Sequence, residues 1–157
     1  MSEIRTVLAA LVCGEECASI QRILSGAEWA LRVAPSFSDA EAALRSASFG
    51  VVICGCRLAD GSGWQDVLAR VQRMPVPPQL IVADRLADEV LWAEVLNLGC
   101  YDLLTTPFAA EEVLRVVPMA WDFWKRELER TGVRPKPPKL AKPKRDLSKG
   151  FLAAGAD

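Results

Sequence analysis

The chain contains no histidine among its 157 residues, and this narrows the chemistry that it can perform. Histidine is the commonest general base, a usual ligand of zinc and the partner of the nucleophile in Ser-His and Cys-His pairs. Without it, hydrolysis by these routes is closed to the protein. We therefore expect no enzymatic activity.

Five cysteines are the remaining candidates for nucleophilic, redox or metal chemistry. Neither Cys13 with Cys17 nor Cys54 with Cys56 has the two-residue gap of a zinc knuckle. The sequence shows neither a basic and then apolar leader nor an apolar run of the roughly 18 residues that span a bilayer. These features predict a cytoplasmic protein with reduced thiols, no membrane contact, no metal and no cofactor, whose cysteines serve as small buried side chains.

The apolar residues change their spacing repeatedly along the chain, and the order of these changes predicts the fold. Apolar runs of strand length alternate with segments at helical spacing, joined by short loops. The predicted strands cover residues 6–12, 28–34, 50–56, 79–83 and 101–105. Strands that are joined by helical crossovers form a parallel sheet covered on both faces. The sequence therefore predicts a doubly wound, three-layer α/β domain with five parallel strands, of which residues 50–56 form a central one.

Caps and apolar inner faces mark the predicted helices. Ser38 with Glu41, and Ser62 with Gln65, have the spacing of N-terminal capping motifs for the second and third helices. We expect a fourth helix at residues 88–98 and a last, long helix after Pro107. The predicted inner faces are Trp64, Val67, Leu68 and Val71 in the third helix, Leu91, Val95 and Leu98 in the fourth, and Val113, Val117, Ala120, Trp121 and Trp124 in the last.

Ligands of such sheets bind outside the carboxyl ends of the central strands, and the segments at those ends resemble a known family. VVICGCRLADGSGW (residues 51–64) and GCYDLLTTPF (residues 99–108) are similar to the third and fifth strands, with their following turns, of the receiver domain of two-component response regulators. RLADEVLWAEVLNLGCYD (residues 85–102) looks like a stand-alone, degenerate pseudo-receiver subgroup. The resemblance covers roughly residues 4–126 and implies a flavodoxin-like sheet with strand order 2-1-3-4-5.

A receiver accepts a phosphoryl group on a carboxylate that ends its third strand, with a Mg²⁺-binding acidic pair, a hydroxyl and a lysine around it. The resemblance assigns other residues to these positions here. They are Gly55 for the acceptor, Cys13 and Gly14 for the acidic corner, Ala83 for the hydroxyl, Leu103 for the aromatic switch and Thr106 for the lysine. Glycine cannot form an acyl phosphate, and residues 1–124 contain no lysine. We therefore expect a receiver that cannot be phosphorylated.

Two acidic groups leave alternatives open. Asp60 follows the third predicted strand and is an alternative acceptor, although aspartate before glycine is usually a turn residue. Glu15 and Glu16 could form a displaced metal pair, but adjacent acids at a helix start more often remain solvated and interact with the helix dipole.

Aromatic residues on the last elements indicate a candidate interaction surface. The resemblance suggests that the face formed by the fourth helix, the fifth strand and the fifth helix contacts a protein partner, which could be a kinase, a regulator or a second copy. The candidate residues are Trp92, Leu96, Tyr101, Trp121 and Trp124. Large aromatic residues at helical spacing are often core residues, so both interpretations stay open for the tryptophans.

The charge is divided unevenly along the chain. Residues 1–124 contain nine arginines against sixteen acids, a net of −7, whereas residues 125–157 contain ten cations against four acids, a net of +6. We predict a receiver-like domain at residues 1–130 and an extended, basic, proline-rich tail at residues 131–157. Its cations are Arg134, Lys136, Lys139, Lys142, Lys144, Arg145 and Lys149. They could attract nucleic acid, fold back on the acidic body or simply remain solvated.

The leading interpretation is a signalling module that cannot be phosphorylated and that acts by protein–protein interaction in a two-component phosphorelay system. The alternative is a regulator that associates with nucleic acid through the basic tail.

Overall fold

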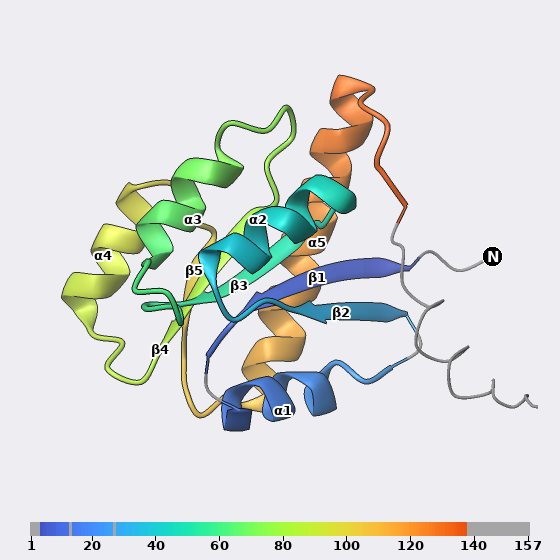
Figure 1. Ribbon diagram of the computed structural model, residues 1–157. Helices are drawn as coiled ribbons and strands as arrows, with labels where there is room; N and C mark the ends of the chain where they lie inside the picture. The colour runs from blue at the N-terminus through green and yellow to red at the C-terminus, as the bar shows by residue number, and fades with distance from the viewer. Residues whose placement is uncertain (1–3, 13, 27, 138–157) are drawn as a thin grey trace, which may run out of the picture.

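The computed structural model describes residues 4–12, 14–26 and 28–137 of the chain, and Figure 1 shows the arrangement of its helices and strands. Five parallel strands form one sheet in the order β2-β1-β3-β4-β5. The strands are β1 (Arg5–Ala10), β2 (Trp29–Val33), β3 (Val51–Gly55), β4 (Gln79–Asp84) and β5 (Asp102–Thr105), and the helices are α1 (Gly14–Ile23), α2 (Phe37–Ser46), α3 (Trp64–Val71), α4 (Glu89–Asn97) and α5 (Ala110–Thr131). The predicted flavodoxin-like fold and its strand order are confirmed.

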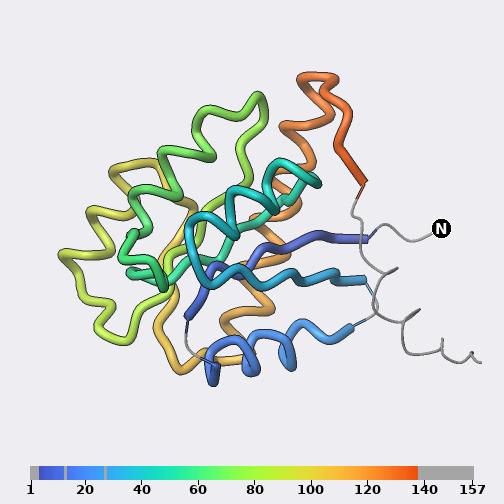
Figure 2. The backbone as a smooth tube through the Cα atoms, in the orientation of Figure 1, coloured from blue at the N-terminus to red at the C-terminus, as the bar shows by residue number. Residues whose placement is uncertain are grey.

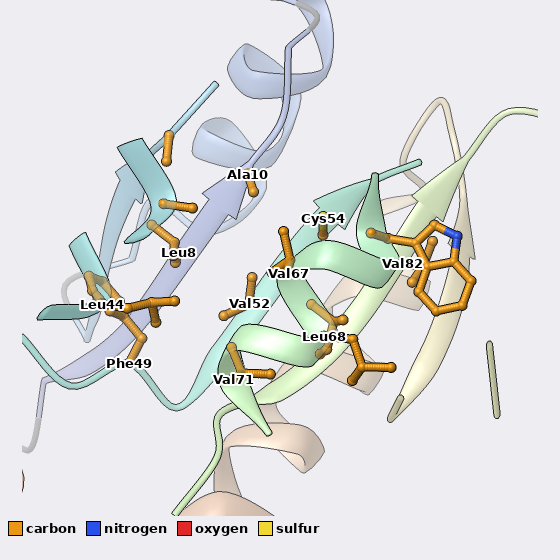
Figure 3. Packing of buried hydrophobic residues seen from close by; sticks show 14 of the residues in the cluster. Leu8, Ala10, Leu44, Phe49, Val52, Cys54, Val67, Leu68, Val71 and Val82 are labelled. Carbon is orange, nitrogen blue, oxygen red and sulfur yellow. The ribbon is translucent and has the colours of Figure 1, made fainter. Parts of the chain in front are cut away.

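Two apolar cores lie on opposite faces of the sheet. Leu8, Val52 and Leu80 face the core under α2, α3 and α4, part of which Figure 3 shows from close by. Their strand neighbours Val7 and Ile53 face the other core, under α1 and α5. Every residue of β3 is buried, as expected for a central strand covered on both faces.

Two helices begin at residues other than the predicted caps. Ser36 caps α2: its hydroxyl accepts a hydrogen bond from the Asp39 amide at 3.0 Å and donates one to the Asp39 carboxylate at 2.9 Å. The assignment of Ser38 was therefore wrong by two residues, because Ser36 and Asp39 have the same capping spacing and directly follow Pro35, where the strand ends. In α3 the cap is Gly63, whose amide donates to the Asp66 carboxylate at 2.9 Å, and not Ser62.

The fourth helix, α4, is only shallowly attached to the sheet. Val95 is its one buried residue, and Leu91 is half-buried. Leu98, predicted to be a core residue, is 47% exposed, because the helix ends at Asn97 and the chain turns away at Gly99 with φ +106°. The apolar composition of α4 therefore leaves large side chains facing solvent.

The last helix, α5, is the longest element and extends past the start of the sheet. It continues beyond Pro118 to Thr131, where Gly132 in the left-handed conformation ends it. Its predicted inner face is buried throughout, including Trp121 and Trp124 near its end. Among the described residues, no helix is both long enough and apolar enough to cross a membrane.

After α5 the chain turns back along the body, and we call residues 133–137 the return segment. Figure 2 shows it running beside the end of α2. The Lys136 amide donates to the Ser48 hydroxyl at 2.8 Å, and the Ser48 amide donates to the Lys136 carbonyl at 3.1 Å. The Lys136 ammonium donates to the Arg45 carbonyl at 2.8 Å, which satisfies a free carbonyl in the last turn of α2.

Candidate functional site

A pocket of about 420 Å³ lies at the carboxyl edge of the sheet, where the acceptor of a receiver is expected. The register aligns Ala10 of β1, Cys54 and Gly55 of β3 and Ala83 of β4 along this edge. The pocket is lined by Val12, Glu16, Gly55, Cys56, Arg57, Ala83, Asp84 and Arg85. We call it the acceptor-equivalent pocket.

Gly55 leaves this pocket without a side chain at the end of the central strand. A Cβ added at Gly55 would lie 3.6 Å from Cδ2 of Leu11 and 3.7 Å from the Arg57 carbonyl, which is ordinary contact. Packing therefore does not demand glycine at this position. A Cβ at residue 55 would therefore be accommodated beside the pocket.

Cys56 and Asp84 are the groups of the pocket that could take part in covalent or acid–base chemistry. The pKa of the Cys56 thiol is raised to about 11, first by burial and then by Asp84, through its charge and by accepting a hydrogen bond from the thiol. Asp84 also accepts a hydrogen bond from the Leu86 amide at 3.0 Å. At neutral pH the thiol remains protonated, and a protonated thiol is a poor nucleophile.

The positions that correspond to the lysine and the aromatic switch lie on β5 and just after it. Thr106 is buried, and its hydroxyl has no hydrogen-bond partner among the described residues. Leu103 is buried against the core under α4 and has no polar group that could report a rotation. Thr106 and Leu103, which the family resemblance assigns to the lysine and the aromatic switch, are thus a buried hydroxyl and a buried apolar side chain.

Asp60 lies outside the acceptor-equivalent pocket. Its carboxylate accepts hydrogen bonds from the Phe37 amide at 3.2 Å and from the Ser62 amide at 3.3 Å. Desolvation raises the pKa of Asp60, but these hydrogen bonds outweigh it and hold that pKa below its ordinary value. The residue joins the loop after β3 to the first turn of α2, which is the turn role that its sequence position indicates.

Glu15 and Glu16, the acids at the start of α1, differ in their surroundings. Glu15 is exposed and Glu16 is half-buried at the pocket, both in the first turn of the helix next to Gly14. No group of three or more acids and cysteines that could hold a metal ion occurs among the described residues. Cys13, the other residue assigned to the acidic corner, lies outside the described part of the chain.

Comparisons with known proteins can be set beside this geometry. No family model matches the sequence, and neither does any curated protein. The signal receiver domain of an HD domain-containing protein from Pseudomonas fluorescens Pf-5 is 25% identical with a TM-score of 0.73, and the match covers 83% of this chain and 96% of that one. Chemotaxis response regulator CheY4 of Vibrio cholerae is 18% identical with a TM-score of 0.65, covering 74% and 98%. The beryllofluoride-activated NtrC4 receiver domain dimer is 20% identical with a TM-score of 0.68, covering 76% and 98%. This chain has the receiver fold.

Within the receiver fold, a second pocket of about 590 Å³ lies between α4, β5 and α5. We call this surface the α4–β5–α5 face. Trp92 on α4 is 50% exposed. Asp102, which precedes Leu103 in β5, is half-buried and lines the same pocket. The pocket is lined by Ala87, Asp88, Glu89, Trp92, Asp102, Leu103, Thr105, Glu112 and Arg115. The face therefore presents an exposed indole among four acids and one cation.

The other predicted interaction residues have different surroundings. Leu96 and Tyr101 are half-buried, and the Tyr101 ring lies 6.3 Å from the exposed ring of Phe123. Trp121 and Trp124 are only 4% and 5% exposed, at the edge where the strands of the receiver fold begin. Their burial favours the core interpretation, one of the two that the sequence left open, because α5 extends past the start of the sheet and packs both rings against Gly50.

The basic tail is described only at its start. Arg134 and Lys136 belong to the return segment and are exposed. Lys139, Lys142, Lys144, Arg145 and Lys149 lie outside the described residues. The position of the return segment could not be predicted from the sequence, because its hydrogen bonds use the backbone of Ser48 and Arg45 and the Ser48 hydroxyl rather than an apolar pattern.

Proposed function

We propose that this protein is a cytoplasmic, receiver-like signalling module that is not phosphorylated, has no enzymatic activity and acts by protein–protein interaction in a two-component phosphorelay system. The observation that carries the proposal is Gly55 at the end of β3, where a receiver needs a carboxylate. The absence of lysine from residues 1–124 supports it, because no local realignment can supply the cation.

The neighbouring groups offer no replacement nucleophile. Cys56 holds its proton with a pKa of about 11. The Asp60 carboxylate accepts hydrogen bonds from the amides of Phe37 and Ser62 and does not line the acceptor-equivalent pocket. Thr106 has no general base as a hydrogen-bond partner among the described residues. The pocket does hold the carboxylates of Glu16 and Asp84 and the guanidinium groups of Arg57 and Arg85. None of these groups ends β3, and no lysine accompanies them, so a phosphoryl group would lack the acceptor and the ammonium that a receiver supplies.

The α4–β5–α5 face supports the interaction half of the proposal. Trp92 is half exposed, and Val90 on the same helix is 76% exposed. Asp88, Glu89, Asp102 and Glu112 surround the indole at the pocket. An exposed indole with an acidic rim suits a partner surface that carries lysine or arginine around an apolar centre.

A second copy of this chain is a less favourable occupant of that face. A twofold dimer brings the same surface of each copy together, so the four acids of one pocket would meet the four of the other. Like charges at an interface oppose association. We therefore propose a kinase or regulator with a basic contact surface as the partner, rather than a homodimer through this face.

The chemical half is tested with acetyl phosphate and Mg²⁺. The full-length protein is incubated with both, and its intact mass is measured beside that of a receiver known to accept the phosphoryl group. We expect no mass increase in this protein. A mass increase by one phosphoryl group, mapped to any aspartate, would contradict the proposal.

The interaction half is tested by affinity capture from native cell extract. Wild-type protein, Trp92→Ala and Val12→Ala are compared; Trp92 and Val12 are both 50% exposed, but Val12 lines the acceptor-equivalent pocket. We expect a specific protein to be retained by the wild type and by Val12→Ala and to be lost with Trp92→Ala. Equal retention by all three variants would remove the α4–β5–α5 face from the proposal.

A further inference from the structure

The two edges of the sheet carry opposite charge. Each helix runs against the strands, so all helices begin at the carboxyl edge and end at the amino edge. The first turns of the five helices contain seven acids. The last turns contain Arg22, Arg45, Arg70 and Arg130. The body is acidic overall, but this acidity is concentrated away from the amino edge.

A cationic pocket of about 280 Å³ lies at the amino edge, between the ends of α2 and α3. Arg45 comes from the last turn of α2, Arg70 from the last turn of α3, and Arg134 and Lys136 from the return segment. No aspartate or glutamate is among the described residues that line it. Four cations from three separate parts of the chain therefore converge without an acid in the lining.

Two of these cations are not neutralised by the protein. Arg70 forms an ion pair with Glu41 at 3.4 Å, and the Lys136 ammonium donates to the Arg45 carbonyl. The guanidinium groups of Arg45 and Arg134 are exposed and form no ion pair with any residue in the described ranges. Guanidinium groups bind phosphate oxygens with paired hydrogen bonds, so these two are suited to an anion.

The hydrogen bonds of the return segment attach the basic tail to this pocket. Ser48 fixes Lys136 through two backbone-directed bonds, and the described chain ends one residue later, at Pro137. Between residues 139 and 149 the sequence adds five more cations and one acid. Arg134 and Lys136, which lie at the pocket, are thus followed in the sequence by further cations.

We propose that the amino edge, with Arg45 and Arg134 as its fixed contacts, binds the phosphodiester backbone of nucleic acid. A backbone with one charge per about 1.7 Å matches a series of closely spaced cations better than a short acidic peptide does. The pocket offers no exposed aromatic ring on which a base could stack, because its two aromatic residues, Phe49 and Trp124, are both buried. The Trp124 Nε1–H also already donates to the Val76 carbonyl at 3.4 Å. Binding is therefore independent of base sequence.

The experiment measures the affinity of the full-length protein for a short fluorescein-labelled DNA duplex by fluorescence anisotropy over a series of salt concentrations. The test variant is Arg45→Gln with Arg134→Gln. The matched control is Arg57→Gln with Arg85→Gln, which removes two exposed arginines at the carboxyl edge. Both double variants change the net charge equally, so they separate a specific contact from general attraction.

We expect binding at low salt that weakens steeply as salt rises. The test variant should lower the affinity by on the order of tenfold and reduce the salt slope by about 2, one for each lost phosphate contact. The control should bind like the wild type, and a duplex of another sequence should bind equally well. The variants replace exposed side chains, and matching thermal unfolding midpoints will show that both remain folded.

Three results would overturn the inference. The first is no binding of the duplex at low salt. The second is an equal loss of affinity in the test and control variants, which would show that only net charge matters. The third is displacement of the duplex by an equal charge concentration of polyglutamate, which would point to an acidic protein instead. None of these results depends on the α4–β5–α5 face or on the absence of phosphorylation.

Discussion

Trp121 packs directly on Gly50, the residue before β3: a Cβ added to Gly50 would stand 2.6 Å from Cδ1 of the indole. The same Cβ would lie 2.7 Å from Cε3 of Trp124, whose ring centroid is 6.0 Å from that of Trp121. The two indoles therefore leave no room for a side chain at Gly50, where α5 crosses the chain before β3.

Gly50→Ala should destabilise the protein, because neither buried ring can move away without disturbing the packing of α5. We expect the free energy of unfolding to fall by about 1–3 kcal/mol, as is usual for overpacked cores. Urea unfolding measures the change. Gly14→Ala is the matched control, since a Cβ there meets no atom within 4 Å. Equal stability of the two variants would show that the indoles do not depend on Gly50.

Gly55→Asp should fold normally, because its Cβ would make only ordinary contacts, the nearest at 3.6 Å from Leu11. We still expect no phosphorylation by acetyl phosphate with Mg²⁺, since no lysine faces the pocket and Thr106 stands in its place. Intact mass after incubation measures the outcome. A stable phosphoryl adduct on the new aspartate would show that the missing carboxylate is the only defect of the site.

The Cys56 thiol should react slowly with iodoacetamide near neutral pH. Burial and the neighbouring Asp84 raise its pKa to about 11, so the reactive thiolate forms only in alkaline solution. Asp84→Asn removes the charge and should speed the alkylation of Cys56 at about pH 8.5, near the ordinary pKa of a thiol. Peptide mapping by mass spectrometry follows this one cysteine. An unchanged rate in Asp84→Asn would show that burial alone protects the thiol.

The buried thiols should also make the protein less stable in alkaline solution. Burial raises the pKa of Cys54, and it raises that of Cys100 from 9.0 to about 12. Above pH 9 the unfolded chain loses thiol protons that the native protein keeps, so the free energy of unfolding falls as pH rises. Urea unfolding between about pH 8 and 11 measures the fall, around the thiol pKa. Cys100→Ala should show a shallower decline; parallel curves for the two proteins would contradict this account.

The fold was predictable because each change in the spacing of the apolar residues along the sequence corresponds to one helix or strand. The polar-free run in β3 indicated a central strand, and the motifs around Gly55 indicated the strand order through the family resemblance. Helix starts were less certain, because Ser36 and Ser38 both have an acid three residues later, and only the chain direction after Pro35 decides between them.

The amino edge was not predictable from the sequence in the same way. The helical spacing of Trp121 and Trp124 suits either core or surface residues. The feature that decides for the core is Gly50, directly before β3, against which both rings pack. The pairing of Ser48 with Lys136 joins residues 88 positions apart through the Ser48 hydroxyl and backbone groups of both residues. Such contacts leave no apolar pattern, so the sequence leaves open whether this segment, rich in proline and lysine, remains solvated, folds back on the acidic body or attracts nucleic acid.

The burial of the tryptophans has a spectroscopic consequence. The chain has five tryptophans, of which Trp64, Trp121 and Trp124 are buried and Trp29 is half-buried under the Arg5 guanidinium. Trp92 alone is half exposed on α4. Acrylamide in solution should therefore quench mainly the emission of Trp92, and a protein that covers this indole can be followed by intrinsic fluorescence without any attached dye.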